Sequence, residues 1–209
     1  MVDRFNPQGF IHPRFVVDQF ARLLGPTKTS YGGWFYTKPD TDLSQGDLLV
    51  IPGVVQRDIG DSGEVATVES PYAVLLSNSC DMQPDREDFA LVAPVRPILA
   101  PDEITARTGD AVPDQYRELY KSITQYENTA YCYFPKWTDV TAGYLDFGQI
   151  VSVPLALLHE VVATKADSHL ASLKQEAYYL LIAKLSLYLC RPDDRWIDGA
   201  AFSAAMAPT

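Results

Sequence analysis

Five apolar residues, Tyr72 to Leu76, run without a break into a cluster of small polar residues that ends at Asp81. An apolar run of this length is typical of a strand buried on both faces, although a short buried helix segment gives the same pattern. The polar cluster then places hydroxyl, amide, thiol and carboxylate groups at one end of that strand. We therefore expect a central strand that ends in chemically capable side chains.

The composition is that of a globular protein with a substantial core. Of the 209 residues, 47% are hydrophobic and 21% are charged, which fits one domain over 1–209. No stretch approaches the roughly 18 consecutive apolar residues of a membrane span, and the N-terminus lacks the layout of a secretory signal. Cys80, Cys132 and Cys190 form neither a C-x-x-C pair nor an even disulfide set. We expect a cytoplasmic protein that does not associate with a membrane.

The charge balance bears on the choice of partner. The chain has 17 basic and 27 acidic residues, a formal net charge of −10, and no basic run. Nucleic-acid binders gain affinity by neutralising phosphates with clustered Lys and Arg, so the balance disfavours broad attraction to RNA. It leaves room for a narrow basic cleft, and it suits a protein that docks on a basic partner.

The order of apolar runs predicts an α+β fold, because strands do not alternate regularly with helices as in a doubly wound parallel sheet. We expect a small, partly closed antiparallel β-barrel of the SH3-like type with a helical insertion and a long C-terminal helix. The expected segments are an N-terminal helix near 15–24 and an aromatic strand at 31–36 (both within 1–44), a barrel over 45–160 with strands at 48–51, 72–77, 89–95, 130–134 and 144–153, a loop or ragged hairpin at 54–70, a helical insertion at 100–130, a short turn at 155–158, and a C-terminal helical segment at 161–195 whose apolar stripe covers 168–190.

Four short motifs occur in a suggestive order: Gly46-Asp-Leu-Leu-Val-Ile, Pro71-Tyr-Ala-Val-Leu-Leu-Ser-Asn, Ala90-Leu-Val-Ala-Pro-Val and Gly143-Tyr-Leu-Asp-Phe-Gly-Gln-Ile-Val-Ser-Val. This order resembles the PemK/MazF family of toxin-like SH3-type barrels, over residues 45–100 and 143–160, about a third of the chain. The resemblance implies an endoribonuclease of a bacterial toxin–antitoxin or phage-defence setting, with an antitoxin as partner.

RNA-cutting members of that family carry an Arg-Pro pair and a Ser or Thr after Pro-Ile or Pro-Val. This chain has Ser70-Pro71 at the first place and Arg96 at the second. If the chain cuts RNA, Arg96, Arg57 and Asp81 are the residues we expect around the scissile phosphate. The alternative is a non-catalytic barrel that binds a protein or small-molecule partner, and a homodimer stays open as its assembly.

A binding pocket is the second hypothesis for the polar residues, with Ser77, Ser79, Cys80, Asp146 and Gln149 as its lining. Asp146 and Gln149 flank Gly148, which suggests a bulge where Asp146 makes structural hydrogen bonds, although acid–base chemistry is an alternative. We predict no metal site and no cofactor, since the Cys and His residues lack tetrahedral ligand spacing.

The Cys80-Asp81 pair has further interpretations. Cys80 is either a small buried hydrophobe, with Asp81 as the cap of the following turn, or a nucleophile whose base would be His12, His159 or His169. Lys184, which stands alone on an apolar helix, is expected to extend outward into solvent.

Overall fold

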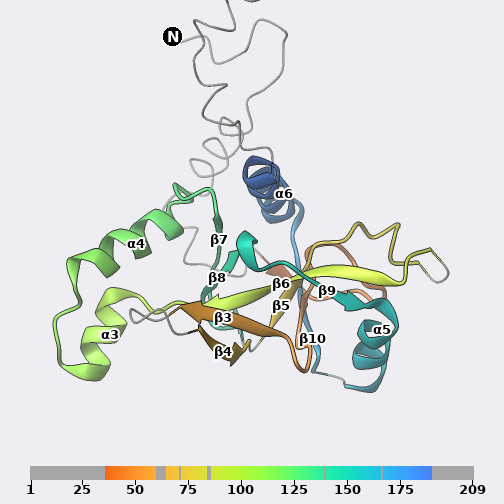
Figure 1. The fold of residues 1–209 in the computed structure, drawn as a ribbon, viewed down its shortest axis with the longest axis horizontal. Helices are drawn as coiled ribbons and strands as arrows, with labels where there is room; N and C mark the ends of the chain where they lie inside the picture. Colours follow the sequence, from red (N-terminus) through yellow and green to blue (C-terminus); the bar gives the residue numbers. More distant parts are fainter. Residues whose placement is uncertain are drawn as a thin grey trace, which may run out of the picture.

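The protein is described from a computed structural model over residues 36–59, 65–70, 72–83, 86–138, 140–165 and 167–189 (Figure 1). The expected N-terminal helix and all of the aromatic strand except Tyr36 lie outside the described residues, as do His12 and Cys190. None of the described helices is both long enough and apolar enough to span a bilayer.

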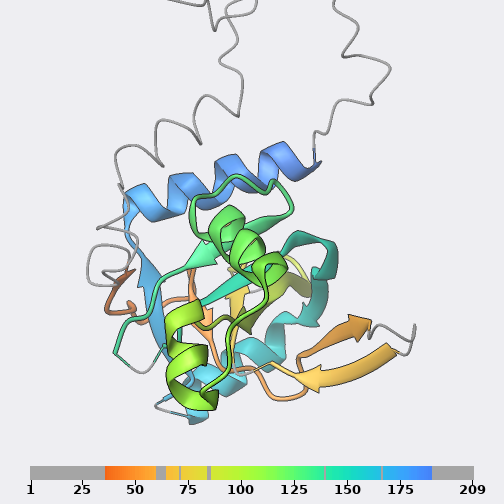
Figure 2. The same cartoon turned by 90° about the vertical axis from the view of Figure 1, so that its left-hand side faces the viewer.

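The main sheet is an antiparallel half-barrel in the order β1-β10-β2-β5-β6-β8-β7, and β9 pairs with β6 beside β8. A separate hairpin, β3–β4, projects from the body of the molecule (Figure 2). The strands are β1 (Tyr36–Thr37), β2 (Leu48–Leu49), β3 (Val55–Ile59), β4 (Val65–Glu69), β5 (Ala73–Leu75), β6 (Phe89–Pro97), β7 (Tyr131–Phe134), β8 (Gly143–Asp146), β9 (Val151–Pro154) and β10 (His169–Leu173).

Strand β5 confirms the expectation of a strand buried on both faces. Its three residues are completely buried and lie between β2 and β6. Val74 packs into one hydrophobic cluster, whereas Ala73 and Leu75 pack into a second one. Because successive side chains of a strand point to opposite faces, β5 separates the two cores of the molecule.

Helices α6 (Gln175–Leu189) and α5 (Leu155–Thr164) pack on different cores. Helix α6 contributes Ala177, Leu180 and Leu181 to the cluster that holds Val74. Helix α5 contributes Leu155 and Leu158 to the other cluster. The two helices therefore pack on opposite faces of the central strand.

The expected helical insertion is confirmed between β6 and β7. It consists of α3 (Pro101–Thr108) and α4 (Asp114–Thr124), and proline stands at the first position of α3 and just before α4. Glu103 accepts a hydrogen bond from the backbone N–H of Ala100 at 3.2 Å, which satisfies a donor at the start of α3. The insertion lies at the β8 end of β6, and α5 lies at the other end (Figure 1).

The elements after residue 154 differ from those that the sequence predicts. Residues 169–173 form strand β10, so the last described helix begins at Gln175 rather than near 168, and residues 155–164 form α5 where a short turn was expected. The Ser168 hydroxyl donates to the carbonyls of Val161 and Lys165 at 2.9 and 2.7 Å. Ser168 thus closes the end of α5. Residues 55–59 and 65–69 pair in regular antiparallel register as β3 and β4, which corresponds to the hairpin alternative for 54–70.

The sequence suggests that Lys184 extends outward into solvent. In the structure, its side chain is completely buried. Its Nζ donates to the carbonyl oxygen of Tyr126 at 3.1 Å and also to that of Asn128. The amine therefore joins α6 to the turn that follows α4. Tyr126 has a φ of 58°, which is strained for a bulky side chain. Its buried ring and its bonded carbonyl hold it there.

Candidate functional site

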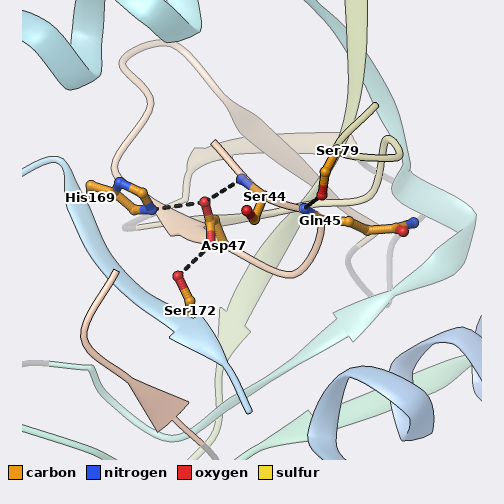
Figure 3. A network of polar contacts seen from close by, with 6 residues as sticks. All are labelled: Ser44, Gln45, Asp47, Ser79, His169 and Ser172. Atoms are coloured by element: carbon orange, nitrogen blue, oxygen red, sulfur yellow. Dashed lines mark hydrogen bonds and ion pairs between the residues drawn. The ribbon is translucent and has the colours of Figure 1, made fainter. Parts of the chain in front are cut away.

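The densest polar arrangement surrounds Asp47, at the start of β2 (Figure 3). Asp47 is completely buried, and its Oδ2 accepts from the backbone N–H of Ser44 at 2.7 Å and lies 2.8 Å from His169 Nε2. Its Oδ1 accepts from the hydroxyl of Ser172 at 2.5 Å. A buried carboxylate needs such partners, because an uncompensated charge in the interior is costly.

A β-bulge explains how His169 and Ser172 reach the same carboxylate. Residues three apart in a regular strand point to opposite faces of the sheet. The register between β10 and β2 shifts between His169 and Ala171, where one extra residue is inserted. The bulge therefore turns both polar side chains of β10 toward Asp47.

The turn before Asp47 is closed by a glycine that the geometry requires. Gly46 has a φ of 94°, a conformation that L-residues with a side chain rarely adopt. A Cβ at this position would also come within 3.2 Å of the Leu173 side chain. Gly46 thus allows the chain to turn closely against β10 and to present Asp47 to it.

Gln45 extends the network to the end of β5 and to α6. Its backbone N–H donates to Ser79 Oγ at 3.0 Å, and its Nε2 donates to the carbonyl of Leu76 at 2.5 Å. The hydroxyl of Tyr178 donates to Gln45 Oε1 at 2.9 Å. The side chain thereby connects three segments that are far apart in the sequence.

The order of groups around Asp47 indicates what chemistry the network can perform. In a nucleophilic triad, the histidine lies between the hydroxyl and the carboxylate, so that it can take the hydroxyl proton. Here the carboxylate lies between Ser172 and His169, and the Ser172 proton points to Asp47. This arrangement cannot activate Ser172 through His169. It is suited to fixing the β2–β10 pair.

The polar cluster after β5 is also occupied with structural hydrogen bonds. Ser77 Oγ accepts from the N–H of Leu91 on β6 at 2.8 Å. The hydroxyl takes the position that a backbone carbonyl would occupy if the pairing of β5 with β6 continued. Asn78 Oδ1 accepts from the N–H of Cys80 at 3.1 Å, and the N–H of Asp81 donates to the Asn78 carbonyl at 3.0 Å. Asn78, rather than Asp81, makes the turn of the Asx type.

Cys80 does not fit the interpretation of a small buried hydrophobe, because it is exposed. The cysteine hydrolase hypothesis gains no support either. Within the described residues no hydrogen bond or ion pair joins Cys80 to a histidine: His159 is exposed on α5, and His169 is paired with Asp47. A nucleophilic thiol needs a base in reach.

The three residues expected around a scissile phosphate are distributed over different parts of the fold. The turn that holds Asp81 adjoins β6 at Leu91, since the N–H of Leu76 donates to the Leu91 carbonyl. Arg96 lies five positions further along β6, which is about 16 Å in a strand, opposite Tyr144 of β8. The backbone of Arg57 lies in the β3–β4 hairpin. The strand order therefore separates Asp81 from Arg96.

Asp146 and Gln149 lie at a 3-10 helix between β8 and β9 rather than at the bulge that the sequence suggests, and Asp146 makes structural hydrogen bonds there. Asp146 Oδ1 accepts from the N–H of Gly148 at 2.9 Å, and its Oδ2 accepts from Gln149 Nε2 at 3.2 Å, around the 3-10 helix η1 (Phe147–Gln149). Across the strands, Asp146 pairs with Tyr131, not with the end of β5. In the described part of the chain, no three His, Cys, Asp or Glu side chains are grouped to hold a metal ion.

A cluster of Arg and Tyr side chains lies on β6, β8 and β7, and no sequence motif indicates it. The guanidinium of Arg96 lies 5.8 Å from the ring centre of Tyr144, and the rings of Tyr144 and Tyr131 meet edge to face at 5.0 Å. Burial raises the pKa of Tyr144, and the charge of Arg96 opposes that shift. Only the pairing of the three strands brings these residues together.

Neither the models of known protein families nor the curated proteins include one that matches this chain. The chemistry of the site is therefore inferred from its own residues.

Proposed function

We propose that this protein is a non-catalytic binding protein built on an SH3-like half-barrel. One observation carries the proposal. The turn that holds Asp81 adjoins β6 at Leu91, whereas Arg96 lies five residues further along the same strand. General acid–base chemistry on a phosphodiester requires its groups within hydrogen-bond reach of one reacting centre. The register of β5 and β6 does not bring these two groups together.

The polar groups at the end of β5 add support. Ser77 and Ser79 accept backbone hydrogen bonds, and the buried Asp47 carboxylate accepts hydrogen bonds from Ser44 and Ser172. Groups that stabilise turns in this way are poorly placed to exchange protons with a substrate. The net charge of −10 favours a basic partner, such as a basic segment of another protein, over RNA.

A divergent PemK/MazF-like endoribonuclease of a toxin–antitoxin or phage-defence setting is the second candidate. It is favoured by the half-buried Arg96 beside Tyr144. A cation next to an aromatic ring is a recurring feature of single-strand binding, where rings stack on bases. On this proposal, Arg96 binds phosphate while Tyr144 or Tyr131 contacts a base.

An RNA cleavage assay tests the two candidates against each other. Labelled single-stranded RNA of mixed sequence is incubated with the protein and with Arg96→Ala, whose thermal unfolding is measured to show that it folds. We expect no cleavage by either protein and no growth arrest when the protein is expressed in bacteria. Cleavage by the wild type that disappears in Arg96→Ala would overturn the binding proposal and support the endoribonuclease.

A further inference from the structure

One face of the sheet carries exposed apolar side chains where a core would be expected to continue. Phe89 and Leu91 of β6 are 58% and 48% exposed, whereas Ala90 and Val92 between and beside them are buried. Opposite them on β9 stand Pro154 and Ser152, which are also exposed. Directly paired residues lie on the same face of a sheet. These four residues are called the Phe89 face below.

The strand beside this face has a free edge. β9 pairs with β6 on one side, and no strand of the described chain pairs with its other side. An unpaired edge presents backbone donors and acceptors on which another strand can add. Pro154 closes the edge at one end because it has no N–H. The N–H of Leu155 donates to Asp88 on the β6 side, so by alternation the N–H groups of Val153 and Val151 also face β6, and Ser152 is the residue that presents its N–H at the free edge.

The charges next to the Phe89 face are mainly negative. Glu87 and Asp88 directly precede Phe89, Asp81 lies in the turn that adjoins Leu91, and all three are exposed. Arg86 is the one cation in the described segment between this turn and Phe89. An acidic rim around apolar side chains is complementary to a segment that carries basic and apolar residues.

We propose that the Phe89 face docks an extended, basic segment of a partner protein, which adds a strand to the free edge of β9. Apolar side chains at alternate positions of that segment pass over the small Ser152 and contact Leu91 and Phe89. Basic side chains at the two ends of the segment lie near Asp81, Glu87 and Asp88. This proposal rests on the proposed function, because it names the partner class of a protein that binds rather than cuts.

A pair of synthetic peptides tests the proposal on the full chain. One labelled peptide of about ten residues, the Lys–Val peptide, alternates Val and Ser in its centre and carries Lys at both ends, and its matched control carries Glu in place of Lys. Fluorescence anisotropy is expected to show binding of the Lys–Val peptide alone, weakened by added salt. Phe89→Ser and Leu91→Ser should each weaken it at least about tenfold. Leu119→Ser and Tyr179→Ser, at exposed apolar positions elsewhere, should leave it unchanged.

Hydrogen exchange identifies the strand that is paired. The amide of Ser152 should become protected when the Lys–Val peptide is added, and the amides of β3 and β4 should not. Absence of binding, equal binding of both peptides, or binding that is insensitive to Phe89→Ser and Leu91→Ser overturns the proposal. Self-association that these two variants abolish, without selective peptide binding, overturns it in favour of a second copy as occupant.

The two proposals fail in different ways. RNA cleavage that depends on Arg96 would contradict the proposed function, and Phe89→Ser should not affect that cleavage. If the Lys–Val peptide does not bind selectively and no RNA is cleaved, only the assignment of the partner is contradicted.

Discussion

Asp47 organises two segments of the chain around one buried carboxylate. A hydrogen bond to a charged group contributes about 1.5–3 kcal/mol to stability, and a donor left unsatisfied in the interior costs a similar amount. The backbone N–H of Ser44 and the hydroxyl of Ser172 donate to the Asp47 carboxylate from two separate segments of the chain, and His169 Nε2 lies 2.8 Å from its Oδ2. Removing the carboxylate therefore affects both segments at once.

Replacing Asp47 by Asn should destabilise the fold, with Asp47→Ala more severe. Asn keeps one acceptor oxygen for Ser44 and His169, and its amide can donate to the Ser172 hydroxyl, so we expect a loss of about 1–3 kcal/mol in the free energy of unfolding. Urea denaturation at neutral pH measures it. Asp42→Asn is the matched control, since Asp42 is exposed in the same region. Equal stabilities for the two Asn variants would contradict a structural role for Asp47.

The network around Asp47 could be predicted only in part from the sequence. Gly46-Asp47 stood out as the opening of a strand, and Ser77 and Ser79 stood out as polar residues at a strand end. His169 and Ser172 did not, because their spacing of three places them on opposite faces of any regular strand. The bulge that turns both toward Asp47 depends on pairing with β2, which local sequence does not encode.

At the scale of elements, strands with an unambiguous apolar pattern could be predicted from the sequence, and strands whose pattern also fits a helix could not. β5 and β6 are continuous apolar runs bounded by polar turns, and such runs at buried positions are strands. Leu170 and Leu173 fit the helical spacing of the stripe in α6 equally well, so the predicted helix extended over β10. What separates the two elements is the pairing of β10 with β1 and β2.

Helix α6 depends on Lys184 for its attachment to the insertion. We expect Lys184→Met to lower the free energy of unfolding by about 2–5 kcal/mol, because the carbonyls of Tyr126 and Asn128 lose a donor while a similar volume stays filled. Circular dichroism during thermal unfolding measures this. Lys165→Met is the matched control at an exposed position at the end of α5. A stability equal to that of the control would show that the buried amine is dispensable.

At the scale of the whole molecule, the two cores differ in composition. The core under α6 contains Cys132 and several tyrosines, whereas the core under α5 is built mainly from aliphatic side chains. Burial raises the pKa of the Cys132 thiol to about 12 from 9.0, although Lys184 opposes the shift. Burial also raises the pKa of Tyr36 and of Tyr126 well above 10.0. One core therefore carries acids that must stay protonated in the folded protein.

Alkaline pH should consequently destabilise the protein through this core. A folded-state pKa above the unfolded one means that the folded state retains the proton, so the contribution is full below pH 9.0 and is lost as the pH rises toward about 12. For Cys132 the free energy of unfolding should fall by up to about 1.4 kcal/mol per pH unit in that window. Above about pH 10 the buried tyrosines add to the slope.

Urea denaturation at intervals between about pH 8 and about pH 11, for the wild type and for Cys132→Val, isolates the thiol. The variant fills a similar volume with a group that does not ionise, so its stability should decline less steeply from about pH 9 onward. Cys80→Ser, at the exposed thiol, should keep the wild-type slope. Parallel slopes for the wild type and Cys132→Val would mean that the thiol ionises equally readily in both states. The burial of Cys132 against α6 would then be contradicted.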